Sequence, residues 1–418
     1  MSHTLAGKVL GRAAGKEVRP GEIVVVPVDL AFAHDGTLPL AIQQMEKELG
    51  TRKVFDPAKV AVFCDHASPS PSEKVSNVHI FMRKFAEENG IRQFYENGDG
   101  ICHQLVAELY AAPCKVIIGA DSHTCTHGAL GAFATGMGST DTAVAMAFGK
   151  TWLRVPESHA YVLDGALKFP VASKDAILRI IGDIGADGAT YASMEFLGEA
   201  VARMSMASRM TMANMAVEAG GKAGMCAADG TTRQFLADHG RKAEFRELSP
   251  DPGASYAREY RLDCSDLEPL VAAPHRVDNV KPVVELAGTP IQQACLGSCT
   301  NGRLEDFEVA ARILGGKRVA PGVRLVVFPA SRRVLLEAVR AGYISTLLEA
   351  GAAVQAPACG FCIGRTIALG DGEVAISSQN RNFKGRMGND SGFIYVASAA
   401  TVAASALRGE IADPREVA

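Results

Sequence analysis

The stretch that decides the fold is Pro357-Ala-Cys-Gly-Phe-Cys-Ile-Gly-Arg365, together with a single cysteine far upstream in Gly297-Ser-Cys-Thr-Asn301. The pair Cys359 and Cys362 sits in a glycine-rich turn, so two thiolates can approach one metal centre, and Cys299 adds a third. Three thiolates are an odd set, and they leave a position open on the metal, unlike a closed site of four cysteines. An open metal position predicts catalysis.

Two other interpretations of these cysteines stay open. They could be three unrelated thiols, or they could hold a structural zinc ion that a histidine completes. Cys295 is a rival ligand, four residues before Cys299. Because Cys295 precedes the Gly-Ser turn, we expect it to be a packed thiol.

Length and composition predict a multidomain α/β protein. The chain has 418 residues, of which 48% are hydrophobic and 21% charged, with 42 glycines. A formal charge of −3 leaves no basic field for a polyanion, so no nucleic acid is expected as a partner. The ten cysteines mostly stand singly in apolar surroundings, which predicts a cytoplasmic location. We find no signal peptide and no apolar run near the roughly 18 residues of a membrane span, so no membrane is expected.

Acid and imidazole groups follow two predicted strands directly. The run Glu22–Val28 reads as a first strand, before a helix that begins near Thr37. Strand Val60–Cys64 then ends on Asp65-His66, and strand Val116–Ile118 leads into Asp121-Ser-His123. Between them, His103 lies on a predicted helix over Ile101–Tyr110. Ligand crevices of open α/β sheets lie at the carboxyl ends of strands, so these groups are expected to line one cleft. Taken singly, each dyad could equally be a turn or a cap.

Changes of composition along the sequence predict three domains, over residues 1–157, 158–280 and 281–418. The second contains a methionine-rich amphipathic segment that we interpret as core rather than as a copper site. Its methionines are Met204, Met206, Met210, Met212 and Met215. The third has a predicted strand at Arg324–Phe328 and a helix at Arg332–Ala341.

An anion site is predicted at Asn380-Arg-Asn-Phe-Lys-Gly-Arg386, where three cations and two amides follow a strand at Val374–Ile376. An open metal, two acid–imidazole pairs and an arginine–amide clamp suit the removal of hydroxide from a small hydroxy-carboxylate. A Lewis acid can bind the hydroxyl, a histidine can protonate it, and arginines can orient the carboxylates.

With these motifs in place, the chain resembles the aconitase superfamily, and within it the branch of 3-isopropylmalate dehydratase and homoaconitase large subunits. The resemblance covers nearly the whole chain. Thr126 stands where aconitases carry an asparagine, which favours this branch over aconitase itself. The motifs are Phe63-Cys-Asp-His-Ala67, Gly100-Ile-Cys-His-Gln104, Asp121-Ser-His-Thr-Cys-Thr-His-Gly128, Gly297-Ser-Cys-Thr-Asn-Gly302, Cys359-Gly-Phe-Cys-Ile-Gly-Arg365 and Asn380-Arg-Asn-Phe-Lys-Gly-Arg-Met-Gly388.

The resemblance implies an α/β fold of three aconitase-like domains, with mixed and parallel sheets flanked by helices around a central Fe-S cleft. It implies a 4Fe-4S cluster with one open iron, held by Cys299, Cys359 and Cys362. By motif match it assigns catalytic roles to Asp65, His66, His103, Asp121, His123 and Glu195. It assigns substrate contacts to Ser122, Asn380, Arg381 and Arg386.

The resemblance further implies a hydro-lyase acting on a small di- or tricarboxylate, with 3-isopropylmalate in leucine biosynthesis as the leading substrate. Homoaconitate and dimethylmalate or citraconate are alternatives. The sequence ends at Ala418 without the mobile fourth domain that carries the serine base in aconitases, so we expect a separate small subunit, and thus a heteromer, to supply it. An iron- or oxygen-sensing Fe-S protein that binds RNA is the non-enzyme alternative, which the acidic composition disfavours.

Overall fold

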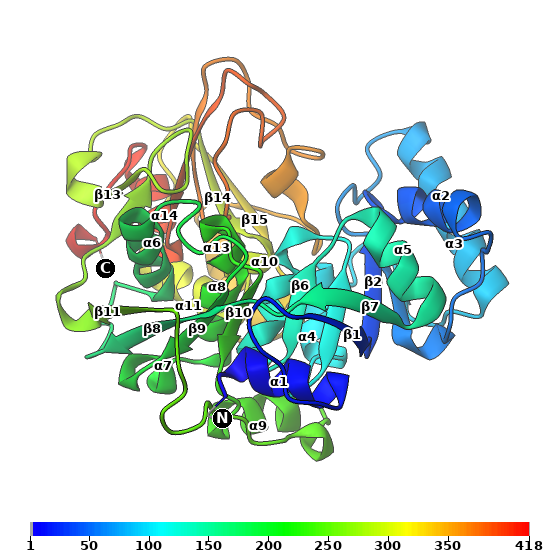
Figure 1. The fold of residues 1–418 in the computed structure, drawn as a ribbon. Coiled ribbons are helices and arrows are strands. Elements are labelled where there is room, and N and C mark those ends of the chain that lie inside the picture. The colour runs from blue at the N-terminus through cyan, green and yellow to red at the C-terminus, as the bar shows by residue number, and fades with distance from the viewer. Residues whose placement is uncertain (1–2, 418) are drawn as a thin grey trace.

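The computed structural model describes residues 3–417, and its first sheet is a five-stranded, fully parallel one in the order β4-β3-β2-β5-β6. Its strands are β2 (Leu30–His34), β3 (Val60–Phe63), β4 (Phe94–Tyr95), β5 (Val116–Gly119) and β6 (Phe133–Gly136). The accompanying helices are α2 (Leu38–Glu48), α3 (Glu73–Asn89), α4 (Cys102–Leu109) and α5 (Ser139–Phe148), with the 3-10 helix η2 (Ser122–Leu130). Helices α2, α3 and α5 lie at one side of the molecule in Figure 1.

The predicted first strand belongs to a different sheet. The residues at Ile23–Pro27 form β1, which pairs antiparallel with β7 (Lys150–Arg154) in a separate two-stranded ribbon. The strand that enters the first sheet is β2, which the sequence analysis did not predict. Before the ribbon comes helix α1 (Leu5–Ala14), capped by the hydroxyl of Thr4.

A second sheet of four parallel strands has the order β10-β9-β8-β11. Its strands are β8 (Ser158–Asp164), β9 (Ser193–Leu197), β10 (Ala223–Cys226) and β11 (Arg258–Asp263). Its helices are α6 (Ser173–Ile184), α7 (Glu199–Arg203), α8 (Met206–Met215) and α9 (Gly230–Asp238).

A third sheet has seven strands in the order β13-β12-β18-β17-β14-β15-β16, antiparallel only at the first two pairings. Its strands are β12 (Leu270–Ala272), β13 (Val280–Pro282), β14 (Gln293–Gly297), β15 (Arg324–Phe328), β16 (Ala353–Val354), β17 (Val374–Ser377) and β18 (Phe393–Ala397). Its helices are α10 (Ser298–Asn301), α11 (Leu304–Leu314), α12 (Arg332–Arg340), α13 (Tyr343–Glu349), η7 (Gly360–Ile363) and α14 (Ala399–Arg408). Short 3-10 turns complete the chain: η1 (Pro57–Lys59), η3 (Ala216–Ala219), η4 (Lys242–Glu244), η5 (Cys264–Asp266), η6 (Val283–Glu285) and η8 (Pro414–Glu416).

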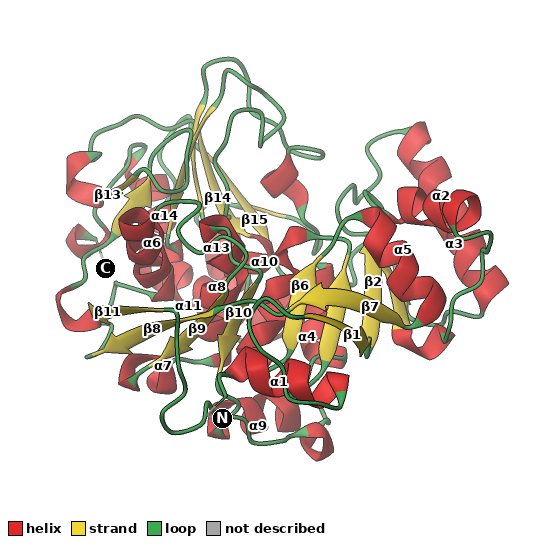
Figure 2. Ribbon diagram, in the orientation of Figure 1, coloured by secondary structure: helices red, strands yellow, loops and turns green. Residues whose placement is uncertain are grey.

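The α/β class with parallel and mixed sheets is thus confirmed, and Figure 2 shows helices against all the larger sheets. The domain boundaries after residues 157 and 280 stay a prediction. Within residues 3–417, no helix is both long enough and apolar enough to span a bilayer.

The methionine-rich helix α8 is the part of the core that joins the sheets. Met206 and Met210 pack in a cluster with the first sheet. Met212 and Met215 pack in another cluster that holds residues of the second and third sheets. The methionines of this helix are therefore core residues, as predicted, and the helix lies between the parts that form the site.

Candidate active site

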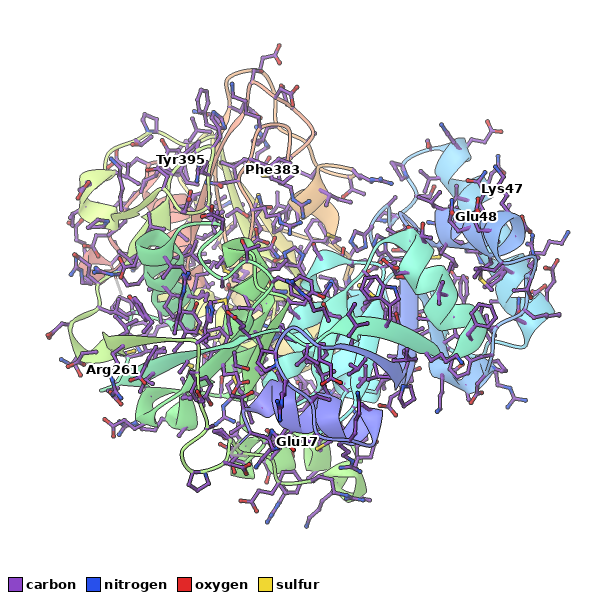
Figure 3. The ribbon with its side chains drawn as sticks, viewed as in Figure 1. Glu17, Lys47, Glu48, Arg261, Phe383 and Tyr395 are labelled. Carbon is purple, nitrogen blue, oxygen red and sulfur yellow. The ribbon has the colours of Figure 1, made fainter. Side chains whose placement is uncertain are left out.

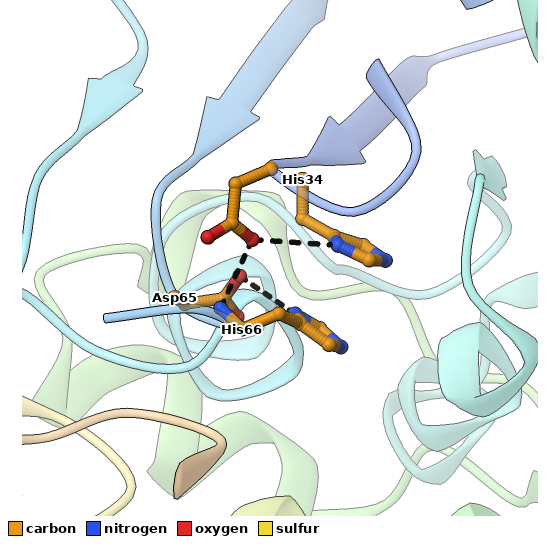
Figure 4. Close-up of side chains that lie close together, drawn as sticks. His34, Asp65 and His66 are labelled. Carbon is orange, nitrogen blue, oxygen red and sulfur yellow. Dashed lines mark hydrogen bonds and ion pairs between the residues drawn. The ribbon is translucent and has the colours of Figure 1, made fainter. Parts of the chain in front are cut away.

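Three neighbouring strands of the first sheet end on an acid–imidazole pair. His34 closes β2 and is followed by Asp35, Asp65-His66 follows β3, and Asp121 follows β5. Because β3, β2 and β5 are adjacent and parallel, their carboxyl ends meet at one edge of the sheet. The rings of His34 and His66 stack there, with centroids 3.6 Å apart and planes 12° apart, as Figure 4 shows.

Asp121 is the centre of this group. His103 Nε2 donates to Asp121 Oδ1 over 2.7 Å, and the other oxygen lies 3.5 Å from His66 Nε2 and 3.6 Å from His34 Nε2. The backbone N–H of His123 also donates to Asp121 Oδ1 over 2.8 Å. Burial opposes the negative charge, but these imidazoles, led by His103, lower the pKa of Asp121 well below its usual value. Asp121 is therefore an anion that sets the charge of the surrounding rings.

His66 is held as a cationic acid. Its Nδ1 donates to Asp65 Oδ1 over 2.9 Å, and Asp65 Oδ2 is fixed by the backbone N–H of Cys102 over 2.7 Å. Burial opposes the charged ring, but Asp65 and Asp121 outweigh it and raise the pKa of His66 well above its usual value. By contrast, burial lowers the pKa of His103, which is therefore neutral. With Nδ1 bound to Asp65, the ring of His66 has Nε2 left to give a proton.

Asp35 holds the backbone that carries His66. Its two oxygens accept from the backbone N–H groups of His66 and Ala67 over 3.1 and 2.8 Å, and His79 Nε2 lies 3.1 Å from Oδ2. Sequence analysis missed His34, Asp35 and His79. The signal for the first two was present, because His34-Asp35 is the same acid–imidazole pattern at a strand end.

The three predicted cysteines meet this group from the third sheet. Cys299 follows β14, and Cys359 and Cys362 lie on the turn of η7. All three thiols line one cavity of about 380 Å³ with His66, His103, Asp121 and His123. The backbone N–H of Cys359 donates to the carbonyl of Asp65 over 2.8 Å, which fastens the cysteine turn to the acid pair.

Glycine is required beside two of the cysteines. Gly297 has a φ of 139°, and a Cβ there would lie 2.2 Å from the carbonyl oxygen of Phe328. Gly360, between the paired cysteines, has a φ of 54°, and a Cβ would lie 2.4 Å from the Phe328 ring. Both turns need the left-handed region and a close approach to β15, which only glycine permits.

Nitrogen donors surround the sulfur atoms. Asn214 Nδ2 donates to Cys299 Sγ over 3.3 Å, with Asn380 Nδ2 at 3.8 Å, and Arg386 Nη2 donates to Cys362 Sγ over 3.2 Å. The hydrogen bond from the Cys359 thiol, reinforced by Arg386, lowers the pKa of Cys362 well below its usual value in spite of burial. A thiolate with N–H donors around it is what a metal or cluster ligand needs.

A buried charge chain leads from the imidazoles to the arginines. His123 Nε2 lies 2.7 Å from Glu218 Oε1, and Arg381 Nε donates to Glu218 Oε2 over 3.0 Å. Burial opposes the Glu218 charge, but Arg381 and His123 outweigh it and lower its pKa. Sequence analysis missed Glu218, whose signal was a lone carboxylate in an apolar run after the methionine helix.

Both arginines of the predicted anion site lie at the cavity, and both have partners inside the protein. Arg381 binds Glu218 and Arg386 binds Cys362, although Arg386 Nε is buried without a partner. Arg365, which was not among the predicted site residues, also lines the cavity and is exposed. Phe383, from the segment between Arg381 and Arg386, is labelled in the upper part of the molecule in Figure 3.

Three predicted residues do not line the cavity. Asp65 lies behind it, where its Oδ1 accepts from the His66 ring. Glu195 is buried at the first turn of α1, where it accepts from the backbone N–H groups of Leu5 and Ala6 over 2.9 and 3.0 Å and from Ser158 Oγ over 2.9 Å. The buried glutamate that contacts site residues is Glu218, which binds His123 and Arg381. Glu195, the residue predicted for this place, lies elsewhere. Ser122 lines an adjoining hollow rather than the cavity itself.

The donor set fits an iron-sulfur cluster. Three thiols converge on one cavity, with amide and guanidinium N–H groups directed at their sulfur atoms. Two groups of imidazoles and carboxylates are alternative places for a metal ion, because the possible ligand atoms within each group lie within 4.8 Å of one another. In both groups, however, hydrogen bonds link some of these atoms to each other. Their members are His34, Asp35, Asp65 and His66, and His103, Asp121 and His123. Cys295, the rival ligand, is buried inside β14 as predicted.

Comparison with known proteins defines the class. A model of the aconitase family (aconitate hydratase) matches residues 8–290 and 277–409, so the chain belongs to the aconitase family. The prediction of a hydro-lyase is thereby confirmed.

Among its relatives, a 3-isopropylmalate dehydratase large subunit of Elusimicrobium minutum is 51% identical over 418 residues, covering 100% of both chains. A 3-isopropylmalate dehydratase large subunit 2 of Archaeoglobus fulgidus is 52% identical over 417 residues, again covering 100% of both. The crystal structure of Thermococcus kodakaraensis aconitase X shares the fold with a TM-score of 0.50 at 13% identity, covering 90% of this chain and 89% of that one.

Proposed function

We propose that this chain is the cluster-binding large subunit of a hydro-lyase that isomerises 3-isopropylmalate in leucine biosynthesis. The observation that carries the proposal is that three thiols and the cationic acid His66 face one cavity. The substrate is supported by full-length relatives of about 50% identity that are named for it.

We further propose that Cys299, Cys359 and Cys362 hold a 4Fe-4S cluster. Such a cluster with three protein ligands supplies a Lewis-acidic iron that can bind a hydroxyl and a carboxylate. The protein surrounds it with N–H donors from Asn214 and Arg386, which favour the thiolate form of the ligands.

In this proposal His66 gives its Nε2 proton to the leaving hydroxyl. The Nδ1 proton stays on the ring, where its hydrogen bond to Asp65 orients the imidazole. Asp121 stabilises the charged imidazole until Nε2 gives up its proton. The transfer converts the leaving hydroxide into water and leaves the His66 ring neutral. In the reverse step, the hydration, water returns a proton to the ring and restores its charge. The Glu218 link holds His123 and Arg381 in fixed positions beside this acid.

The arginines bind the carboxylates. Arg381, Arg386 and Arg365 line the cavity together with Asn380. Arg386 Nε has no partner within residues 3–417, and a substrate carboxylate would supply one. Arg365, at the rim, is free to bind a second carboxylate of a di- or tricarboxylate.

The base that removes the carbon-bound proton belongs, in this proposal, to a small subunit. The proposal is supported by the relatives, whose printed names call them large subunits. A cytoplasmic location is part of the same proposal, since all ten cysteines are free thiols, and free thiols persist in reducing compartments.

The test is anaerobic reconstitution with iron and sulfide, followed by assays with the small subunit expressed from the same organism. We expect about four iron atoms per chain and hydration of the unsaturated acid derived from isopropylmalate in preference to homoaconitate, citraconate or citrate. Cys359→Ser should abolish the cluster, and the matched control Cys295→Ser should keep it. One zinc and no iron, or an intact cluster in Cys359→Ser, would contradict the proposal.

A further inference from the structure

The β1–β7 ribbon has an apolar outer face. Ile23, Val25 and Trp152 are 66%, 60% and 54% exposed. The residues between them point inward and are buried, namely Val24, Val26, Thr151 and Leu153. An antiparallel ribbon with one buried side normally turns polar side chains to water on the other, so this pattern is unusual.

The exposed side chains are contiguous. In the register of the ribbon, Val25 stands directly opposite Trp152, and Ile23 stands opposite Arg154. Side chains that face each other across an antiparallel pair touch, so valine and tryptophan form one surface with isoleucine at its end. Among the described residues, neither strand pairs with any third strand. The ribbon lies at the front of the molecule in Figure 1, apart from α2 and α3.

This surface lies beside the candidate active site. Trp152 lines a hollow of about 360 Å³ together with Tyr191, Lys222, Ser122 and Asp121. Asp121 also lines the cavity that holds the three thiols. A chain seated on the ribbon would therefore border the reaction site.

Cations flank the apolar face of the ribbon. Lys150 and Arg154, at the two ends of β7, are exposed on the same side of the strand as Trp152. The hollow itself is lined by Lys222 together with Asp121 and Asp141. The guanidinium of Arg154 lies 4.5 Å from the centroid of the Tyr191 ring, and Lys222 Nζ lies 5.5 Å from it. An apolar centre with an aromatic residue and a charged rim is typical of a protein–protein interface. The positive rim favours carboxylates on the partner.

We propose that the outer face of the β1–β7 ribbon docks the small subunit, through an apolar patch of that subunit with carboxylates around it. The inference rests on the proposed function, because the small subunit is the partner that function requires. A subunit docked here would cover the hollow at Ser122, which shares Asp121 with the cavity that holds the three thiols. Other occupants, a second copy of this chain above all, are outcomes of the test.

The first experiment measures the affinity between the reconstituted large chain and its purified small subunit. Val25→Glu with Trp152→Glu should weaken the complex about 100-fold or more, as the loss of a buried aromatic anchor does. The control is Ile80→Glu on α3, which is equally exposed at 59% and lies on a helix at the edge of the molecule, apart from the ribbon in Figure 1. Unchanged affinity in the double variant, or an equal loss in the control, would overturn the inference.

The second experiment uses the chain's one tryptophan, Trp152, as a reporter. Binding of the small subunit should shift its emission to shorter wavelength and protect it from acrylamide quenching. A complex of Trp152→Phe supplies the partner's background signal. If the complex forms and Trp152 stays as accessible as in the free chain, the docking face is elsewhere. If the large chain alone self-associates and the double variant abolishes that, the face is a homodimer contact.

The two proposals fail in different ways. The variants lie outside the cluster site, so iron content of the double variant should equal that of the unaltered chain. Loss of iron there would show that the fold was damaged, and the conservative variant Val25→Thr with Trp152→Gln then replaces it with the same expected direction. Absence of a cluster or of hydration in the unaltered pair would instead refute the proposed function.

Discussion

Replacing Asp121 with asparagine tests the claim that this carboxylate sets the charge of the catalytic histidine. The substitution keeps the shape of the side chain and removes its charge. His103 and the backbone N–H of His123 keep an oxygen to donate to, whereas His66 loses the nearby negative charge.

The magnitude follows from the geometry. Asp121 Oδ2 lies 3.5 Å from His66 Nε2. At an effective dielectric constant of about 20, two unit charges at that distance interact by about 5 kcal/mol. The carboxylate side chain is 15% exposed, so this is an upper limit, equivalent to about three pKa units. We expect the pKa of His66 to fall by about one to two units in Asp121→Asn.

The sign of the pH effect follows. The folded pKa of His66 is above its unfolded value, so the charged ring stabilises the fold below about pH 6.5, and this contribution is lost as the pH rises through the folded pKa. In Asp121→Asn the contribution should be smaller, and its loss should be complete at lower pH. If protonated His66 is the acid, the alkaline limb of the kcat profile should move to lower pH by the same amount.

The assays are the pH profile of the assembled enzyme and an NMR titration of labelled histidines in the cluster-free chain, with His66 assigned through His66→Gln. Asp141→Asn, at the far side of the adjoining hollow, is the matched control. An alkaline limb that stays in place in Asp121→Asn, with normal iron content, would refute the assignment of His66 as the acid that Asp121 charges.

Three further substitutions probe the rest of the site. Glu218→Gln removes the charge that Arg381 binds, so kcat/KM should fall about 10- to 100-fold with normal iron content, and unchanged kinetics would exclude a positioning role. Glu195→Gln cannot accept all the donors at the start of α1, so the free energy of unfolding should fall by about 2 kcal/mol while kcat changes little, and a large fall in kcat with unchanged stability would contradict its structural placement. Arg365→Gln should raise KM about 10-fold with kcat nearly unchanged, whereas the exposed neighbour Lys384→Gln should leave both alone; equal effects of the two would argue against a carboxylate ligand at Arg365.

The sequence predicts the parts of this site that depend on local pattern. Strand ends carry the Asp65-His66 pair, and glycine turns carry Cys359, because a strand period or a left-handed turn is visible within a few residues. His34 was missed because β2 follows β1 after only two residues, and the predicted strand ended at Val28 with none expected before the helix near Thr37. Glu195 was misplaced because a short motif does not show which donors will surround a buried carboxylate.

Asn214 shows why long-range polar contacts escape such prediction and why they matter. Its Nδ2 donates to Thr126 Oγ1 over 2.8 Å and to Cys299 Sγ over 3.3 Å, while its Oδ1 accepts from Thr300 and Asn380 over 3.1 and 3.0 Å. One fully buried amide thus uses both donors and both acceptor positions on partners from other parts of the fold.

The neighbours of Asn214 in sequence are methionine and alanine, so nothing local marks it. The position of Asn214 depends on the packing of α8 between the sheets. Close to this helix, Gly128 and Gly224 approach so closely that a Cβ on Gly128 would lie 1.9 Å from the carbonyl oxygen of Gly224. Close packing places the amide, the amide places Cys299 and Asn380, and Asn380 lies against the sulfur of Cys362. The spacing of the thiols is therefore a property of the interior helix as much as of the cysteine turns, and a cavity opened under α8 should disturb the arrangement of the three thiols.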